Sequence, residues 1–263
     1  MSTPRIYTVA GTLERGSGKA GVEVQLWTPS AGVYDAAGNF YVADRNNHRV
    51  WRLTTDGVMT TVAGTGSPGF DGDGGAAQRA RLHDPAGVAI SAAGDLYIAD
   101  RLNHRIRRVS TSGVIMTIAG TGQAGFGGDN GPALEARLQN PSGLAIDAQG
   151  TLYISDSGNN RLRTISPLGI ITTLAGTGSE GYNGENVPAL QAWLAGPAGL
   201  TIESNGGVVF AEPGNNRVRR VTPDRRVQTV AGNGQFGSGG DGGRDPRRGW
   251  ARPRASRWMQ PGC

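Results

Sequence analysis

Short apolar runs alternate with turns of glycine, asparagine and serine along most of the chain. The stretch 85–118 shows this pattern clearly, with four such runs at residues 87–90, 95–99, 105–109 and 114–118. The residues between them, such as Ala93-Gly94 and Ser112-Gly113, are those that tight turns favour. Four short strands joined by tight turns predict one antiparallel meander of the size of a propeller blade.

The whole pattern recurs at an interval of 56 residues, which indicates a repeat architecture. The segment Ala63-Gly64-Thr65-Gly66 returns, with one substitution in the last copy, at 119–122, 175–178 and 231–234. The segment Tyr41-Val42-Ala43-Asp44 returns in the same register at 97–100, 153–156 and, weakened, at 209–212. We therefore predict an all-β propeller with four complete four-stranded blades, at approximately residues 28–62, 85–118, 141–174 and 197–230.

A glycine-rich connection leads from each predicted blade to the next. Each connection is expected to end in a short helical stretch such as residues 132–138, because Pro132 suits a first helical position. Leu134 and Leu138 would then share one face of that helix.

Two segments resemble a known repeat family. The run PAGVAISAAGDLYIADRLNHRIRRVS at 85–110 resembles the NHL repeat, and AGTGSPGFDGDGG at 63–75 is similar to the lead-in of bacterial NHL arrays. The resemblance covers roughly residues 5–243. It implies a propeller, typically six-bladed, with a central channel. It also implies that the connections and the Asn-x-Arg turns lie on the same face, which usually carries ligands.

Both ends of the chain depart from the repeat. Residues 5–9 match a fourth strand and are expected to close the ring, within a propeller domain that spans 1–243. Residues 244–263 contain six arginines and no NHL pattern, so we expect a frameshifted or truncated repeat there; the alternative is a basic tail for anionic surfaces. Four blades without a closed ring would expose apolar sheet faces, so the chain is expected to be marginally stable or to self-associate.

Charge and composition argue against some classes of partner. The net charge of +5 comes from the tail, because residues 1–243 hold 20 basic and 20 acidic side chains. A neutral body argues against nucleic acid as a partner. No apolar run is long enough to span a bilayer. The first ten residues lack the apolar core of a signal peptide. The sequence therefore does not indicate the cellular compartment. The single cysteine, Cys263, can form no internal disulfide.

Acid and arginine side chains recur five residues apart in all four units. We predict that they form structural pairs across a tight turn, in which carboxylate and guanidinium can make bidentate contacts. The predicted pairs are Asp44 with Arg49, Asp100 with Arg105, Asp156 with Arg161 and Glu212 with Arg217. The alternative is a ring of acids that binds a cation or substrate.

Acidic residues in the glycine-rich loops are the candidate metal ligands. They are Asp71, Asp73, Asp129 and Asp241. Oxygen ligands suit Ca²⁺, but a single loop offers too few of them, so turns closed by the aspartates are favoured over a calcium site. A zinc site would need converging histidines. His48 and His104 occupy turn positions that hold Asn160 and Asn216 in the other units, which indicates turn residues.

The uniformity of the repeats favours a non-catalytic scaffold over an enzyme. No catalytic residue or cofactor is predicted. We expect an interaction module that binds a protein, peptide or glycan through loops on one propeller face. The alternative is a propeller enzyme, resembling lactonase-like hydrolases or amidating lyases, with a metal in the central channel.

Overall fold

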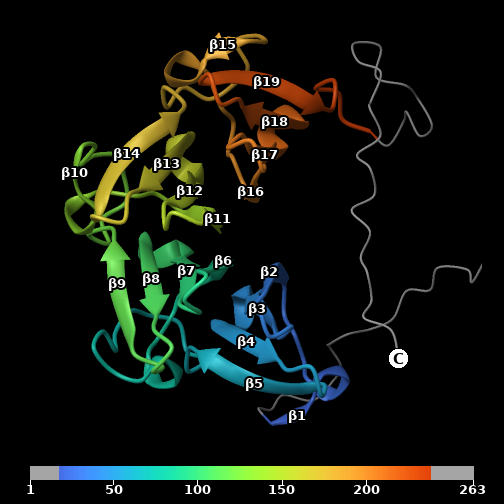
Figure 1. The fold of residues 1–263 in the computed structure, drawn as a ribbon, viewed down its shortest axis with the longest axis vertical. Coiled ribbons are helices and arrows are strands. Elements are labelled where there is room, and N and C mark those ends of the chain that lie inside the picture. Colours follow the sequence, from blue (N-terminus) through green and yellow to red (C-terminus); the bar gives the residue numbers. More distant parts are fainter. Residues whose placement is uncertain (1–17, 238–263) are drawn as a thin grey trace, which may run out of the picture.

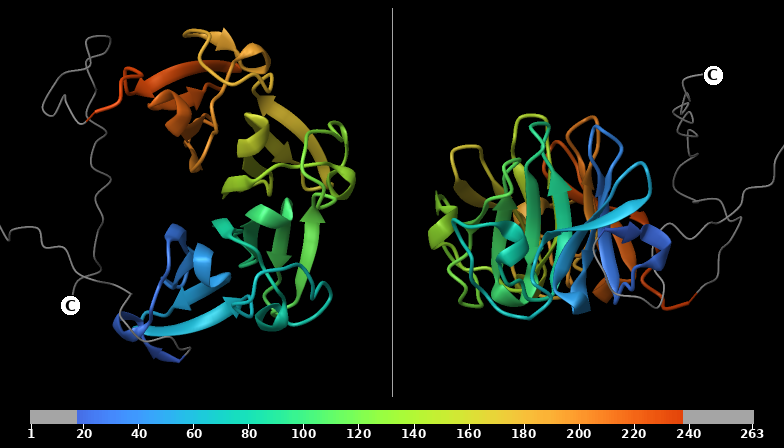
Figure 2. Two further views of the ribbon diagram at one scale, coloured as in Figure 1. Left: turned by 180° about the vertical axis from the view of Figure 1, so that it is seen from behind. Right: turned by 90° about the horizontal axis from the view of Figure 1, so that it is seen from below.

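The computed structural model describes residues 18–237 as four antiparallel sheets arranged in an open arc around a central channel. Figure 1 looks down this channel and shows the gap between the first and the fourth sheet. Figure 2 shows from the side that all four sheets stand at the same height. The predicted all-β propeller architecture and its repeating blades are confirmed. The predicted closing strand at 5–9 and the tail at 244–263 lie outside the described residues.

Blade 2 shows the common plan. Its four strands run in sheet order from the channel outward, each paired with the next along the chain. They are β6 (Pro85–Ile90), β7 (Leu96–Asp100), β8 (Arg105–Val109) and β9 (Ile115–Ala119). The turns between them hold glycines with a positive φ, such as Gly94 and Gly113, where other residues would be strained. All four strands predicted from the sequence are present within two residues of their expected bounds.

The other three blades repeat this order, and each adds a two-residue strand from the preceding connection to its outer edge. Blade 1 consists of β1 (Lys19–Ala20), β2 (Pro29–Tyr34), β3 (Phe40–Asp44), β4 (Arg49–Leu53) and β5 (Val58–Ala63). Blade 3 consists of β10 (Gly131–Pro132), β11 (Pro141–Ile146), β12 (Leu152–Asp156), β13 (Arg161–Ile165) and β14 (Ile170–Ala175). Blade 4 consists of β15 (Val187–Pro188), β16 (Leu200–Ile202), β17 (Val208–Glu212), β18 (Arg217–Val221) and β19 (Arg226–Ala231).

Single 3₁₀ turns are the only helices of residues 18–237, and none is long enough to cross a membrane. Four lie in the connections before the blades: η1 (Gly21–Glu23), η3 (Ala77–Arg79), η5 (Ala133–Glu135) and η7 (Ala189–Gln191). Four lie between the second and third strands: η2 (Arg45–Asn47), η4 (Arg101–Asn103), η6 (Ser157–Asn159) and η8 (Pro213–Asn215).

The helical stretch predicted at 132–138 is shorter than expected. Only Ala133–Glu135 is helical, and Ala136 has an extended backbone. Leu138 is fully buried, whereas Leu134 is largely exposed, so the expectation that they share an apolar face is wrong. The chain leaves the turn too early for positions four residues apart to lie on one face.

Most of the core lies between neighbouring blades, and one further cluster lies within blade 1 and the connection before it. Ile106 and Ala119 of blade 2, for example, pack against Leu144 and Ile154 of blade 3. The connection between the blades adds small or apolar residues to the same cluster, such as Leu138. Burying each large aliphatic side chain contributes about 1.5–3 kcal/mol, so these junctions supply most of the stability.

Candidate functional site

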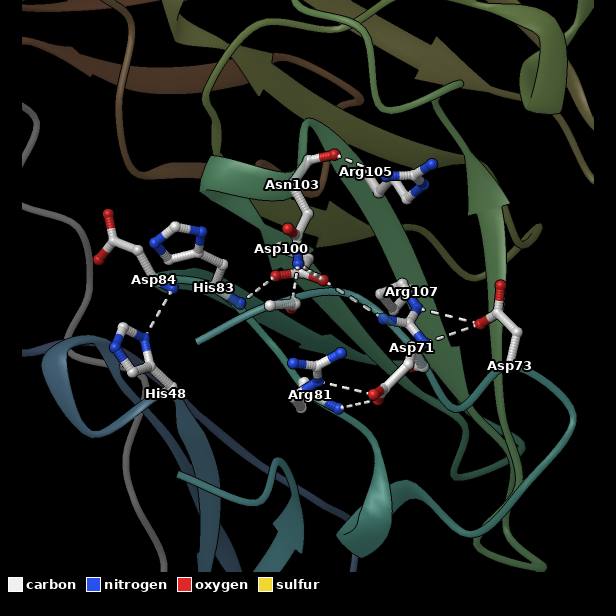
Figure 3. Close-up of polar contacts among 11 residues, drawn as sticks. His48, Asp71, Asp73, Arg81, His83, Asp84, Asp100, Asn103, Arg105 and Arg107 are labelled. Atoms are coloured by element: carbon white, nitrogen blue, oxygen red, sulfur yellow. Dashed lines mark hydrogen bonds and ion pairs between the residues drawn. The ribbon is translucent and has the colours of Figure 1, made fainter. Parts of the chain in front are cut away.

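Each blade carries a buried acid at the end of its second strand, directly before the 3₁₀ turn that leads to the third strand. In blade 2 the carboxylate of Asp100 accepts hydrogen bonds from the amide of His83 (2.7 Å) and the side chain of Asn103 (2.8 Å). Figure 3 shows these contacts at the centre of the cluster. Asp44, Asp156 and Glu212 hold the equivalent place and bind the amides of Trp27, Gln139 and Ala195. The acids therefore tie each incoming connection to its blade.

The charge partner of the buried acid lies seven residues later in the sequence. Arg107 Nη1 lies 3.3 Å from Asp100 Oδ2, and neither side chain is exposed. The equivalent pairs are Arg163 with Asp156 at 3.4 Å and Arg219 with Glu212 at 3.5 Å. In blade 1 a tryptophan replaces the arginine, and Trp51 Nε1 donates to Asp44 at 2.9 Å.

The acid–arginine pairs predicted at a spacing of five residues do not form as ion pairs within residues 18–237. Asp100 and Arg105 are direct neighbours across the ladder, but Arg105 stands at the strand end and turns toward the next loop. Its Nη2 donates to the carbonyl of Thr121 at 2.8 Å. Arg107 lies deeper in the sheet on the same face, so it reaches the carboxylate instead. The expected structural role is retained, with the partner two residues further on.

The four outer arginines of the predicted pairs all bind the loop that follows their own blade. Arg49 donates to the carbonyl of Thr65 at 2.6 Å, and Arg217 to that of Asn233 at 3.0 Å. Arg161 donates to the carbonyl of Thr177. A β-carbon at Gly122 would lie 2.1 Å from Arg105 Nη1, so the glycine leaves room for the guanidinium.

An aromatic ring stacks on both arginines of blades 2, 3 and 4. The guanidinium carbon of Arg105 lies 3.7 Å from the ring centre of Phe70, and that of Arg107 lies 4.8 Å away. Phe126 and Tyr182 repeat the arrangement in the next two blades. Sequence reasoning missed this contact, although the aromatic residues at 70, 126 and 182 follow the same 56-residue interval.

Burial raises the pKa of Asp100 to about 6, against the opposing effects of Asn103, the His83 amide and Arg107. Burial also raises the pKa of Asp156 to about 6, where Asn159, the Gln139 amide and Arg163 oppose it. The cause is the loss of water around the charged carboxylate. These acids are therefore close to a proton equilibrium at mildly acidic pH.

The candidate metal ligands bind arginines. Asp71 accepts from the amide (2.7 Å) and Nε (2.6 Å) of Arg81, and Asp73 accepts from Arg107 Nη2 at 2.7 Å. Asp129 accepts from Arg163 Nη2 at 2.7 Å. The favoured interpretation as locally closed turns is wrong for these three, because their carboxylates reach residues ten or more positions away. Asp241 lies outside the described residues.

No group of three metal-ligating side chains converges anywhere in 18–237. The expectation of no cofactor, with calcium or zinc as the alternative, stays a prediction that rests on the sequence.

The two turn histidines act as hydrogen-bond acceptors between blades. His48 Nδ1 accepts from the amide of Asp84 at 3.2 Å, and His104 Nδ1 accepts from the amide of Asn140 at 3.2 Å. Asn160 Oδ1 does the same for Gly196 at 2.9 Å. Histidine and asparagine both offer an acceptor at this position, which explains why the repeats exchange them.

One polar cluster departs from the repeat, at the channel mouth between blades 1 and 2. Asp84, nearly buried, accepts from Nε (2.7 Å) and Nη2 (2.8 Å) of Arg45, and from Nη1 of Arg101 (2.6 Å). We call these three residues the channel-mouth cluster. Both arginine side chains are about 30% exposed, at 29% and 30%. The two guanidiniums together hold the pKa of Asp84 below its usual value, although burial opposes them.

The channel-mouth cluster borders a groove along the inner strands. The groove measures about 620 Å³ and runs past the inner strands of all four blades, with Arg45 and Arg101 on its wall. Across it, Ser142 Oγ and Ser157 Oγ lie 2.5 Å apart. One side of the mouth is thus cationic, and the other side presents hydroxyl groups.

The Teneurin NHL domain model matches residues 33–125 and 123–181, which together make up more than half of the chain. The chain belongs to the NHL-repeat family. It is 31% identical over 224 residues to Teneurin-3 of Danio rerio, an alignment that covers 74% of the chain and 8% of that protein. It is 26% identical over 261 residues to NHL repeat-containing protein 2 of Bos taurus, covering 88% of the chain and 35% of that protein.

A third relative comes from a plant. The chain is 28% identical over 232 residues to Protein SUPPRESSOR OF QUENCHING 1, chloroplastic, of Arabidopsis thaliana, covering 82% of the chain and 22% of that protein. The chain thus spans about a third or less of the length of these relatives.

Solved structures with the same fold include binding proteins and enzymes. A nidogen/laminin complex aligns with a TM-score of 0.58 at 19% identity, over 81% of this chain and 68% of that one. Virginiamycin B lyase from Staphylococcus aureus aligns with a TM-score of 0.51 at 18% identity, over 77% of this chain and 55% of that one. At these identities the likeness concerns the fold alone.

Proposed function

We propose that this NHL-repeat chain is a recognition module that binds an acidic segment of another protein at the channel mouth between blades 1 and 2. One observation carries the proposal: the other blade junctions do not keep the charges of the channel-mouth cluster. The position of Arg45 and Arg101 holds Ser157 and Pro213 in blades 3 and 4. The position of Asp84 holds Asn140 and Gly196.

A cluster required by the fold would recur in each blade, as the buried acids do. The junctions after blades 2 and 3 form without an Arg–Asp–Arg arrangement, so the fold does not depend on it. The Arg–Asp–Arg arrangement is therefore available for recognition.

The charge balance of the cluster favours an anionic ligand. Two guanidiniums share one carboxylate, which leaves one positive charge at the mouth. The contacts with Asp84 use Nε and Nη2 of Arg45 and Nη1 of Arg101. The remaining donor atoms of both arginines have no partner among the described residues, and a ligand carboxylate could accept from them in bidentate fashion.

A protein ligand agrees with one use of this fold. A nidogen/laminin complex is among the solved structures with the same fold. The 3₁₀ turns that follow the second strands, η2, η4, η6 and η8, hold equivalent places in the four blades, so several blades can contact an extended segment there. The enzymatic alternative, with a metal in the channel, has no observation within residues 18–237 that favours it.

The proposal is tested by titrating the chain with a synthetic hexaglutamate peptide by calorimetry at low salt. We expect Arg101→Gln to weaken binding about tenfold or more, because it removes one guanidinium of a charge-assisted contact. Asp84→Asn should strengthen binding, because it frees both guanidiniums from their internal carboxylate. Arg108→Gln is the matched control. Arg108 belongs to the same blade as Arg101, but it lies in β8 and its Nε is 3.7 Å from Oδ2 of Asp95, near the opposite end of the blade.

Equal binding by the Arg101→Gln and Arg108→Gln chains would contradict the proposal. So would weaker binding by an Asp84→Asn chain whose unfolding midpoint matches the wild type, because that result would assign Asp84 itself to the ligand contact.

A further inference from the structure

All three histidines of the chain lie beside the channel-mouth cluster. His48 and His104 each cap the end of a 3₁₀ turn that an arginine of the cluster begins. His83 directly precedes Asp84 in the sequence. The ring centres of His48 and His83 lie 5.5 Å apart, one ring edge-on to the other, and Figure 3 shows both rings next to Asp84. All three side chains are partly exposed, so they can exchange protons with the solvent.

The charge of the channel mouth depends on the protonation of these imidazoles. Histidine is the side chain whose charge ordinarily changes between about pH 5 and 8. While the imidazoles are neutral, the mouth keeps the one positive charge that remains after Asp84 neutralises one of the two guanidiniums. Their protonation adds up to three positive charges beside the same guanidiniums. The attraction for an acidic ligand therefore grows as the pH falls.

Charged groups on every element around the histidines act on their protonation. These groups are the acids Asp44, Asp84 and Asp100 and the bases Arg45, Arg49, Arg101 and Arg105. Burial lowers the pKa of His48, and His83 acts in the same direction. Asp84 and Asp44 oppose both effects. His48 is therefore neutral at about pH 7.5, and a ligand carboxylate that approaches it favours the protonated form.

His104 behaves in the same way on the other side of Arg101. Burial lowers the pKa of His104, and the positive charges of Arg105 and Arg101 act in the same direction. His83 adds a smaller effect of the same sign. A bound carboxylate offsets this repulsion between positive groups, so it draws a proton onto the imidazole.

Protonation of His48 also removes a hydrogen bond that holds Asp84 in place. Nδ1 of His48 accepts from the amide of Asp84 at 3.2 Å. An imidazolium cannot accept this bond, because both of its nitrogens carry protons. Asp84 has a φ of 57°, in the left-handed region that residues other than glycine rarely adopt. Loss of the bond therefore loosens the residue that competes with the ligand for the two guanidiniums.

We propose that the three histidines make recognition at the channel mouth pH-dependent, so that the acidic segment binds more tightly below about pH 6 than at neutral pH. The inference rests on the function proposed above, because it names the regulation of that same site. Protonation adds positive charge to the mouth and weakens the internal partner of its arginines, and both effects favour the ligand. The ligand is captured at mildly acidic pH and released as the pH returns to neutral.

The proposal is tested by titrating the chain with a synthetic hexaaspartate peptide by calorimetry at low salt, at about pH 7.5 and about pH 5.5. Aspartate suits this test because its ordinary pKa of about 3.9 keeps the peptide charged at both values. We expect the dissociation constant to fall about tenfold or more at the lower pH, as added charge pairs near a protein surface allow. A tenfold gain over two pH units corresponds to an average uptake of about half a proton per bound peptide. Calorimetry in two buffers of different ionisation enthalpy measures this uptake directly.

The other blades supply the residues for a matched control that cannot titrate. Asparagine stands at the position of His48 and His104 in blades 3 and 4, and Gln139 stands at that of His83 in blade 3. The triple variant His48→Asn, His83→Gln, His104→Asn should match the wild-type affinity within about twofold at about pH 7.5. At about pH 5.5 it should lose the gain in affinity and the proton uptake. A second variant, His83→Gln alone, keeps the amide hydrogen bonds of the other two histidines and should take up fewer protons than the wild type.

Equal affinity of the wild-type chain at both pH values would overturn the inference and leave recognition at the channel mouth standing. A triple variant that keeps the full gain would also overturn it. That result would assign the gain to another group, such as the carboxyl of Asp100, whose pKa burial raises to about 6. A wild-type chain that binds the peptide at neither pH would overturn the proposed function and this inference together. Unfolding midpoints measured at both pH values verify that each chain is folded during its titration.

Discussion

The guanidinium of Arg107 binds the carboxylate of Asp100 in a place where neither side chain contacts solvent. Arg107 also binds Asp73, which belongs to the loop before the same blade, at 2.7 Å. One buried cation thus joins the second strand, the third strand and the incoming connection. This arrangement fixes how each connection enters its blade.

Removing the cation should leave two carboxylates without their charge partner. We expect Arg107→Leu to lower the free energy of unfolding by about 3–5 kcal/mol, the usual loss when one member of a buried ion pair is removed. Arg108→Leu, at the neighbouring exposed position, should cost less than about 1 kcal/mol. Urea unfolding of both variants measures the difference, and similar losses would contradict the role of Arg107.

The stacked rings should stabilise the arginines beneath them. Phe126 lies over both Arg161 and Arg163, and each contact of this kind contributes about 0.5–1 kcal/mol at partly exposed sites. Together with the packing lost around the ring, Phe126→Ala should lower the free energy of unfolding by about 1–3 kcal/mol. Phe236→Ala serves as the control, because Phe236 is almost fully exposed. No loss for Phe126→Ala would show that the stacking is incidental.

The raised pKa of Asp100 predicts a pH dependence of stability. Its folded value of about 6 lies above the ordinary value for aspartate, so the folded chain binds the proton more tightly than the unfolded chain between about pH 4 and 6. The contribution of this carboxyl to stability is therefore full below that window and is lost as the pH rises through about 6. Asp100→Asn cannot titrate, so its stability relative to the wild type should improve as the pH rises across this window. Urea unfolding at several pH values measures the difference, and a difference that does not change with pH would refute the raised value.

For the two turn histidines we expect stability to change with pH in the opposite direction. Burial lowers the pKa of His48, aided by His83 and opposed by Asp84 and Asp44. Burial also lowers the pKa of His104, and its neighbours Arg105, Arg101 and His83 act in the same direction. Since the unfolded chain binds these protons more tightly, the contribution is present above about pH 6.5 and is lost at lower pH.

His48→Asn should still accept the hydrogen bond from the amide of Asp84, because Asn160 accepts the equivalent bond from the amide of Gly196 in blade 3. We therefore expect the variant to match the wild type at about pH 7.5 and to be more stable at about pH 5.5, as measured by urea unfolding. Equal stability of the two chains at both pH values would exclude a titrating acceptor.

The 56-residue interval and the short strands were sufficient to predict the blades, since alternating runs and turn glycines specify strands locally. The interval could not show which arginine meets which acid. Arg105 and Arg107 lie on the same face of one strand. Only the depth of each in the sheet decides which of the two reaches the carboxylate of Asp100. The aromatic stacking depends on a loop far from Arg105 in the sequence, and the channel-mouth cluster on a contact between two blades. Both required three-dimensional packing. A comparison of the repeats shows that Arg45, Asp84 and Arg101 are not kept in every unit, but other charged positions vary too, so the comparison alone does not bring these three together.

The most direct test of the account is a map of backbone amide shifts by NMR during titration with the hexaglutamate peptide. We predict that the largest shifts fall at Arg45, Asp84 and Arg101, with little change at the turn glycines of the opposite end, Gly57 and Gly113. Shifts centred on those glycines, or spread evenly over all four blades, would contradict recognition at the channel mouth.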